Sequence, residues 1–135
     1  IQFPEPFEQF ARQLEEQLRK ITEFLVNFES PAQFVLGLVV VAVIPGIGEE
    51  YLFRGVLQNK LRVSWGNAHM AIWVSAFIFS AIHFQFYGFV PRMMLGALFG
   101  YLYLWSGTLW VPIFAHFVNN AYTLIWMYAY QKGLV

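Results

Sequence analysis

Cysteine and aspartate are absent from this sequence, and charge of either sign is scarce. Only 12% of its 135 residues are charged, which is about half the share usual in a soluble domain. Without cysteine there can be neither a disulfide scaffold nor a thiol nucleophile. A net charge of zero, from eight basic and eight acidic residues, also argues against a nucleic-acid-binding surface. Since 59% of the residues are hydrophobic, a disordered chain is excluded as well.

The few acidic residues are distributed unevenly. Six of the eight precede Pro31, and the remaining 105 residues contain only two, Glu49 and Glu50, side by side in an apolar stretch. A body so poor in charge is expected to be embedded in a lipid bilayer. We therefore predict two regions, an N-terminal amphipathic helix in residues 1–30 and a membrane-embedded core in residues 31–135. Because the sequence has few spans and no initiator methionine, we expect it to be a piece of a longer protein.

Residues 5–29 have the pattern of an amphipathic helix. Glutamate and arginine occupy one face, where Glu15 and Arg19 form an i, i+4 pair. The net charge of this segment is −3, from three basic and six acidic residues, which argues against an anchor for anionic lipids. We expect the helix to pack on the body or to lie in the membrane interface, with Ser30 and Pro31 ending it or beginning the next helix. The opposite, apolar face consists of Phe7, Phe10, Leu14, Leu18, Ile21, Leu25 and Phe28.

Four apolar segments follow, at about residues 32–61, 68–84, 91–105 and 109–130. Because a helix needs about 20 residues to span a bilayer, the second and third must tilt or recruit flanking residues. The connections are short, so successive helices should be antiparallel neighbours. Gly96 and Gly100 have the GxxxG spacing that lets two helices approach closely. The sequence thus predicts an all-α membrane bundle of about four transmembrane helices, preceded by the amphipathic helix.

Polar side chains within these apolar segments are the candidates for function, because charge is costly in a membrane and usually faces a bundle interior or a wet cavity. Glu50 and Arg54 are four residues apart, so they share a helix face and can pair. Glu49 is rotated by about 100° from Glu50 and has Phe53, not a basic residue, four positions later. We expect Asn119 to face a neighbouring helix or the lipid headgroups. The full set is Glu49, Glu50, Arg54, His83, His116, Asn119 and Asn120.

The depths of these side chains in an antiparallel bundle can be compared by assuming about 1.5 Å of rise per residue. Measured from the membrane side that carries residues 62–67, Glu49 lies about 20 Å deep and His83 about 24 Å deep. His116 lies about 12 Å deep and Asn120 about 18 Å deep. Independent core polar residues would have no reason to share a level, so we predict one common site.

Two prolines stand four residues before members of this set. Pro45 precedes Glu49, and Pro112 precedes His116. A proline inside a helix frees the carbonyl four residues earlier and kinks the axis. Such an irregularity is tolerated in a membrane where protein or a wet cavity accommodates it. Pro45 is expected to act in this way, whereas Pro112 either does the same or merely begins the last helix.

A carboxylate and two imidazoles in a sequestered, wet cavity can activate water. Glu49 would take a proton from the water, while an imidazole and the Asn120 amide stabilise an oxyanion on a scissile carbonyl. In the alternative, the two histidines and the glutamate hold a catalytic Zn²⁺ with water in the open position. The sequence has no HExxH motif, so the spacing leaves zinc undecided and favours no other cofactor. No Gly-x-Ser-x-Gly context indicates a nucleophilic serine.

Three motifs resemble those of the CPBP family (CAAX protease and bacteriocin-processing), also called the Abi or type II CAAX prenyl endopeptidase family. Glu49 to Arg54 matches its EExxxR signature, Phe79 to His83 its FxxxH element, and His116 to Asn120 its HxxxN element. The motifs occur in order, and the resemblance covers about residues 32–130.

The resemblance implies a multi-pass α-helical endopeptidase of the bacterial inner membrane, acting on a peptide or protein substrate. It implies that Glu49 activates water, that His83, His116 and Asn120 complete the site, and that Glu50 with Arg54 holds it together. A glutamate mechanism without metal is favoured for at least some members of the family.

Two other classes of function fit the same residues. A non-catalytic scaffold or immunity-type protein would bind a peptide or a helix in the same cavity. A proton-coupled transporter would use the buried glutamates and histidines as a relay, but four spans without an internal repeat do not make a complete transporter fold.

Overall fold

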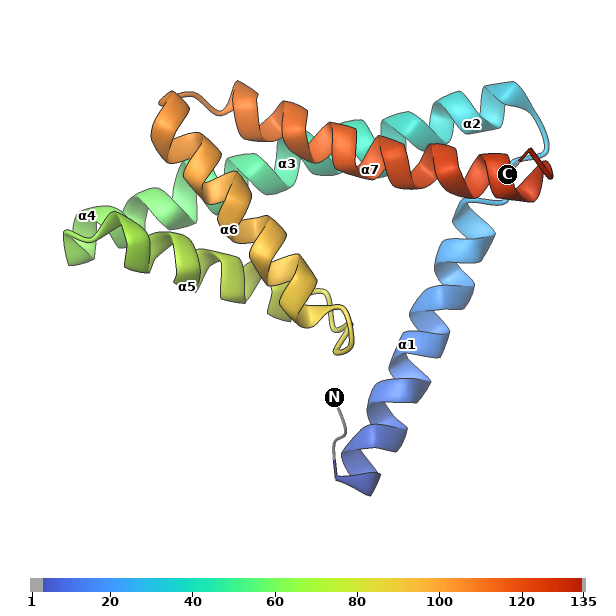
Figure 1. Ribbon diagram of the computed structural model, residues 1–135, viewed down its shortest axis with the longest axis horizontal. Helices are drawn as coiled ribbons and strands as arrows, with labels where there is room; N and C mark the ends of the chain where they lie inside the picture. The colour runs from blue at the N-terminus through green and yellow to red at the C-terminus, as the bar shows by residue number, and fades with distance from the viewer. Residues whose placement is uncertain (1–3, 135) are drawn as a thin grey trace.

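The computed structural model describes residues 4–134, and these residues are almost entirely helical and contain no strand (Figure 1). The all-α class predicted from the sequence is therefore confirmed. The outer ends of the two predicted regions, residues 1–3 and Val135, lie outside the described part. In chain order the elements are α1 (Glu5–Leu25), α2 (Pro31–Leu38), the π-helix η1 (Val39–Val43), α3 (Ile44–Glu50), the π-helix η2 (Tyr51–Gln58), α4 (Asn59–Trp65), α5 (Ala68–Ala81), α6 (Phe89–Ser106) and α7 (Trp110–Gln131).

The elements α2 to α4 form one continuous helix, Pro31–Trp65, of 35 residues, here called the long helix. It begins at a capping box in which the Ser30 hydroxyl accepts from the Gln33 N–H and the Gln33 side chain accepts from the Ser30 N–H. Ser30 and Pro31 begin the new helix, which is one of the two roles predicted for them. The long helix ends at Gly66, whose φ of 64° lies in the left-handed region that suits glycine at this position.

The N-terminal helix is shorter than predicted, because α1 ends at Leu25 instead of continuing to residue 29. Val26 and Phe28 leave the helix and are 2% and 5% exposed, packed in one cluster with Leu124 of α7. Burying a large aromatic side chain stabilises a fold by about 1.5–3 kcal/mol. Phe28 therefore joins the core beneath α2 instead of extending the apolar stripe of α1.

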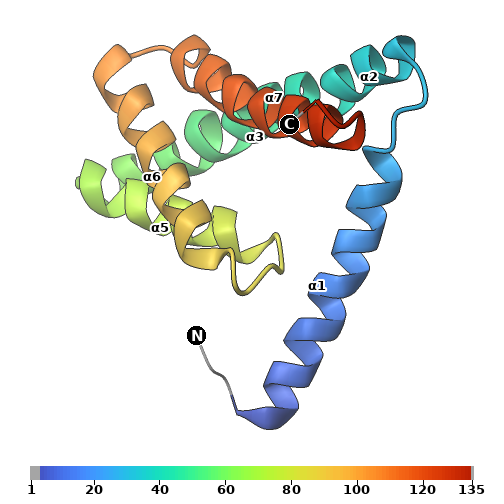
Figure 2. The same cartoon turned by 45° about the vertical axis from the view of Figure 1, so that its right-hand side comes forward.

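The body is built from the long helix, α5, α6 and α7. The long helix and α7 run antiparallel, so the end of α7 lies beside the start of α2, and α5 and α6 form a hairpin (Figures 1 and 2). A Cβ atom added at Gly100 would lie 2.8 Å from Gln58 Oε1 and 2.9 Å from Ile72 Cγ2. The GxxxG glycines thus allow α6 to pack closely on α5 and on the long helix, as the spacing predicts.

Helix α1 slants away from the body, and its first half reaches the loop that joins α5 to α6 (Figures 1 and 2). Much of its apolar stripe is uncovered, since Phe10 is 54% and Ile21 56% exposed. Of the two predicted locations for this helix, the exposed stripe favours the membrane interface over close packing on the body.

Among the described residues, one helix is both long enough and apolar enough to cross a membrane, and this is the long helix. Only 17% of its most apolar 18-residue window is buried, so it is not the core helix of a soluble bundle. The 14-residue helix α5 is apolar but shorter. By length and hydropathy, one described helix qualifies as a membrane span, so the predicted count of four transmembrane helices is not confirmed.

Candidate active site

The centre of the site is a buried network of ionisable side chains from two helices. Glu50 and Arg54 are 0% and 1% exposed, and Arg54 Nη1 donates to Glu50 Oε1 at 2.9 Å. The ion pair expected from their spacing is therefore present. His116 of α7 joins them, with Nδ1 2.7 Å from the same carboxylate oxygen. Because an ionised carboxylate can only accept, Nδ1 carries the proton and the lone pair of the neutral ring is on Nε2.

Two aromatic rings enclose this network. The Arg54 guanidinium lies 5.0 Å from the ring centre of Phe79 on α5 and 5.5 Å from that of Phe99 on α6. Phe99 also stacks on the His116 ring at 5.1 Å. The rings exclude water and attract the cation through their π faces. The Glu50 charge is thus buried together with its counter-ion, as a stable buried charge requires.

The network is tied to α6 by hydrogen bonds that the sequence analysis missed. Arg54 Nη2 donates to the Gly96 carbonyl at 2.6 Å, and Gln58 Nε2 donates to the Gly100 carbonyl at 3.1 Å. Gln58 is 3% exposed. The sequence spacing could have indicated these bonds. Arg54 and Gln58 are four residues apart, and so are Gly96 and Gly100, so each pair lies on one helix face.

Glu49 is placed differently from its neighbour Glu50. Its side chain is 32% exposed, and its Oε2 lies 3.7 Å from His116 Nε2. That separation exceeds hydrogen-bond length and is one that a water molecule can bridge. His116 therefore presents one nitrogen to each glutamate, and only Glu49 is accessible.

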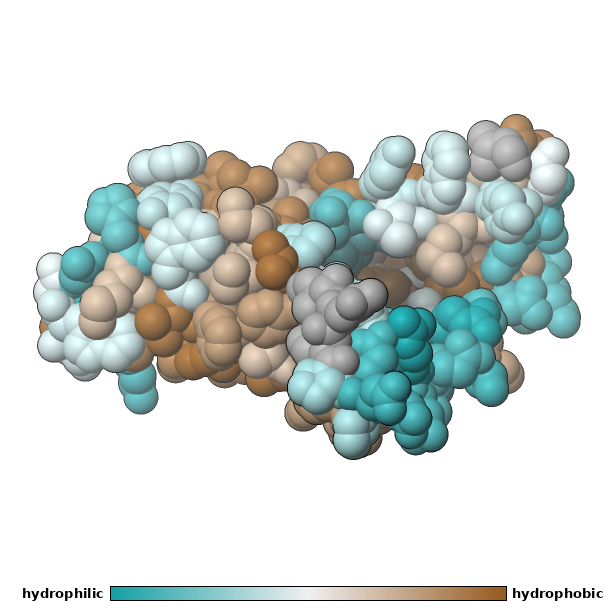
Figure 3. Space-filling model, turned by 60° about the horizontal axis from the view of Figure 1, so that its bottom comes forward, coloured by the Kyte–Doolittle hydropathy of each residue, from teal (hydrophilic) through white to brown (hydrophobic). Residues whose placement is uncertain are grey.

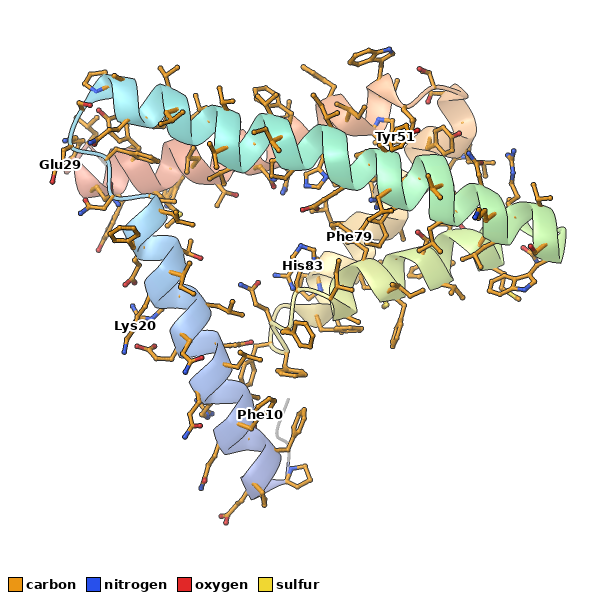
Figure 4. The ribbon with its side chains drawn as sticks, turned by 180° about the vertical axis from the view of Figure 1, so that it is seen from behind. Phe10, Lys20, Glu29, Tyr51, Phe79 and His83 are labelled. Carbon is orange, nitrogen blue, oxygen red and sulfur yellow. The ribbon has the colours of Figure 1, made fainter. Side chains whose placement is uncertain are left out.

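His83 lies just past the end of α5, on the side of that helix that faces the long helix (Figure 4). Its Nδ1 is 2.6 Å from the Phe79 carbonyl, which can only accept, so the lone pair of the neutral ring is on Nε2. Phe79 contacts both imidazoles, with ring centres 4.9 Å from His83 and 6.1 Å from His116. The two histidines thus lie on the same aromatic ring, and each has Nε2 available.

Asn120 has a structural partner related to Pro45. Its Nδ2 donates to the Val41 carbonyl at 3.2 Å. Val41 lies four positions before Pro45, and because proline has no N–H, it cannot form the usual helical hydrogen bond to that carbonyl. The adjacent π-helix η1 is the kind of irregularity that accommodates such a proline. Asn119 is exposed and donates to Asn120 Oδ1 at 3.2 Å.

Pro112 has the simpler of its two predicted roles. It lies in the first turn of α7, which begins at Trp110. A backbone N–H in the first turn has no partner within the helix, so proline costs nothing there. The histidine four residues later is therefore carried on a regular helix, whereas Glu49 follows an irregular one.

The zinc alternative is poorly supported by the donor geometry. Within residues 4–134, no group of three histidine or acidic side chains is arranged to hold a metal ion. His116 Nδ1 and Glu50 Oε1 are already committed to each other. The described side chains therefore do not fit a zinc ion held by two histidines and a glutamate.

A cavity of about 880 Å³ lies between α1, the loop before α6 and the end of α7. This volume is in the range of ligand pockets. Gln85 and Tyr87, two and four residues after His83, form part of its wall. Figure 3 shows the hydrophilic surface of α1 beside a hollow in the molecule. The other lining residues are Arg12, Gln13, Glu15, Glu16, Arg19, Thr22, Glu23, Gly88 and Met127.

The family model of the type II CAAX prenyl endopeptidase Rce1-like proteins matches residues 31–122. This region contains all seven candidate residues and more than half of the chain. The chain belongs to this family. The resemblance drawn from the three motifs is thereby confirmed, and α1 lies outside the matched region.

The chain is also similar to individual bacterial proteins, one of which is named as a protease. The membrane-embedded CAAX protease MroQ of Staphylococcus aureus (strain USA300) is 34% identical over 100 residues, which are 70% of this chain and 40% of MroQ. The uncharacterized protein YpbD of Bacillus subtilis (strain 168) is 33% identical over 88 residues, 62% of this chain and 42% of YpbD. The matches thus span about two fifths of each relative. No solved structure matches the chain significantly.

Proposed function

We propose that this protein is an intramembrane endopeptidase that hydrolyses a peptide bond with a water molecule activated by Glu49. The observation that carries the proposal is the contrast between the two adjacent glutamates. Glu50 is fully buried and neutralised by Arg54, whereas Glu49 is one-third exposed beside a histidine. Membership of a peptidase family supports the same reaction.

In the proposed mechanism, Glu49 takes a proton from water as the oxygen attacks the scissile carbonyl. His83 orients that water through Nε2, the nitrogen that its bond to Phe79 leaves available. The proton on Glu49 then passes to the leaving amine, so that the carboxylate is regenerated.

The tetrahedral oxyanion needs donors on its other side. Asn120 Nδ2 has two hydrogens and donates one to the Val41 carbonyl, and in this proposal the second is donated to the oxyanion. A proton on His116 Nε2 would supply a second donor, with Glu50 balancing the charge at Nδ1. Glu50 and Arg54 act by holding His116.

The setting of this chemistry is proposed as follows. Residues 31–135 form the protease core, with the long helix and the three later helices as spans of a bacterial inner membrane, and residues 1–30 carry the interfacial helix.

The test is cleavage of quenched fluorescent peptides by the purified protein in detergent, with and without a chelator. We expect cleavage that the chelator leaves unchanged. The same peptides are then bound to Glu49→Ala, which should still bind them without cleaving. Binding by both proteins with no cleavage by either would favour a non-catalytic scaffold that uses the same cavity, and activity lost with the chelator and restored by Zn²⁺ would contradict the metal-free reaction.

A further inference from the structure

The loop of residues 82–88 carries His83 and is held at its far end by α1. Immediately after His83, Phe84 has a φ of 53°, a left-handed conformation that is uncommon for a bulky residue. Such a conformation persists where the surrounding contacts impose it. The contacts that fix the rest of the loop therefore bear on the position of His83.

Tyr87 makes the main contacts with α1. Its backbone N–H donates to Glu15 Oε1 at 2.9 Å, and its hydroxyl donates to Glu8 Oε1. The Arg12 guanidinium lies 5.6 Å from the centre of the Tyr87 ring. The hydrogen bond to Glu8 also raises the pKa of the Tyr87 hydroxyl above its ordinary value. Hydrogen bonds to carboxylates are stronger than those between neutral groups.

Two further contacts secure the same loop. Phe7 of α1 packs its ring edge-to-face on Phe86 at 5.1 Å. From the body side, Arg92 in the first turn of α6 donates to the Gln85 side chain. Contacts with α1 and α6 thus fix residues 85–87 of the loop. The start of the loop, just after α5, carries His83.

We infer that Tyr87 and Glu15 are positioning residues that hold His83 in its catalytic orientation, so that α1, outside the matched family region, is part of the active site. This inference rests on the proposed function. In this role Tyr87 and Glu15 act through the four-residue connection to His83. A displacement of about 1 Å at a catalytic group can lower a rate by about a hundredfold, so loosening this connection should be measurable.

The kinetic arm compares two substitutions of Glu15. Glu15→Ala removes the acceptor of the Tyr87 N–H and should lower kcat about tenfold while KM stays within about twofold. Glu15→Gln keeps a carbonyl oxygen that can accept the same bond and should recover most of the loss. Tyr87→Phe, which removes only the hydroxyl, should lower kcat about threefold. Glu5→Ala is the matched control, because Glu5 is exposed on the same helix.

The spectroscopic arm needs no activity. The chain has three histidines, so ¹⁵N-histidine labelling gives a spectrum in which each ring can be assigned by substitution. In the Glu49→Ala background, Glu15→Ala should shift or broaden the His83 ring signals and leave those of His69, which pairs with Tyr101 on α6, in place. Glu15→Gln and Glu5→Ala should leave all three unchanged.

The two arms separate the two claims. If the wild-type protein cleaves no peptide but His83 moves in Glu15→Ala, the proposed function fails and the structural coupling stands. If the wild-type protein cleaves and His83 signals and kcat are unchanged in folded Glu15→Ala, the inference is overturned.

Discussion

At the scale of single residues, the fold gives two adjacent glutamates opposite environments. Glu50 points into the bundle, where it is fully buried beside Arg54 and His116. Glu49 lies one helical position away and remains partly exposed. A rotation of about 100° about the helix axis thus separates a buried, paired carboxylate from a partly exposed one.

The structural role of the buried pair can be tested by Arg54→Met, which keeps much of the volume and removes the charge. Breaking a buried pair from one side costs about 3–5 kcal/mol, because the other charge is left without a partner. We expect a loss of this size in the free energy of unfolding in detergent. The double substitution with Glu50→Gln should lose less than Arg54→Met alone.

The control for this series is Arg62→Met on the exposed end of α4, which should change the stability by about 0.5 kcal/mol or less. If Arg54→Met were no more destabilising than Arg62→Met, the buried ion pair would not hold the site together.

Residue spacing alone predicted part of this arrangement. The four-residue separation of Glu50 and Arg54 is enough to place them on one face. It cannot reveal that His116 contacts Glu50, because that contact depends on how α7 packs against the long helix. Nor does it reveal that Asn120 bonds the Val41 carbonyl, since this requires knowing which helix faces the proline kink.

At the scale of the elements, the approach of α6 to its neighbours depends on a glycine. A methyl group at Gly100 would lie under 3 Å from atoms of Gln58 and Ile72. Gly100→Ala should therefore force α6 outward and cost about 1–3 kcal/mol of unfolding free energy. It should also weaken the bond from Gln58 to the Gly100 carbonyl.

Gly48→Ala is the matched control, because a Cβ atom there meets nothing within 4 Å and alanine is the better helix former. Thermal unfolding of both variants measures the difference, and we expect Gly48→Ala to be neutral or slightly stabilising. Equal stability of the two variants would contradict close packing through the GxxxG glycines.

Helix α1 should respond to acid through its surface ion pairs. The hydrogen bond from Arg19 holds the pKa of Glu16 below its ordinary value of 4.5. Because the folded-state pKa is the lower one, this interaction stabilises the helix above the unfolded pKa and is lost as the pH falls through the folded value. The measurement is the rate of proteolysis after Lys20 by an acid-tolerant protease, compared between acid and neutral pH. We expect this rate to rise in acid, and to rise less in Glu16→Gln than in the wild type.

The sequence pattern predicted the amphipathic character of this helix but not its end. The apolar spacing continues through Phe28, and only the burial of Val26 and Phe28 against Leu124 reveals where the chain turns. Helix boundaries of this kind depend on tertiary packing that a periodic pattern does not contain.

At the scale of the whole molecule, the apolar surface agrees with a protein that lies in a bilayer. Large apolar side chains are uncovered on every helix of the body, among them Leu36 at 62% and Phe114 at 66% exposed. Soluble monomers rarely expose apolar patches so widely. The long helix, at about 52 Å by its residue count, exceeds the hydrocarbon core of about 30 Å, so it must tilt or extend beyond the membrane.

The overall class followed from composition, because a chain so poor in charge has few alternatives to a membrane bundle. The candidate site was predicted from three motifs and their expected depth, and its role stays a prediction. The loop contacts of α1 did not follow, since Glu15 and Tyr87 are 72 residues apart in sequence and neither lies in a motif.

The central claim is that Glu49 supplies the base. Its most direct test is the rate of peptide cleavage by Glu49→Gln, which removes the proton acceptor and keeps the shape of the side chain. The control is Glu29→Gln, which alters an exposed glutamate before the long helix. We predict that Glu49→Gln lowers kcat by about 10²- to 10⁴-fold with unfolding unchanged, and that Glu29→Gln matches the wild type. Wild-type kcat in folded Glu49→Gln would contradict the account.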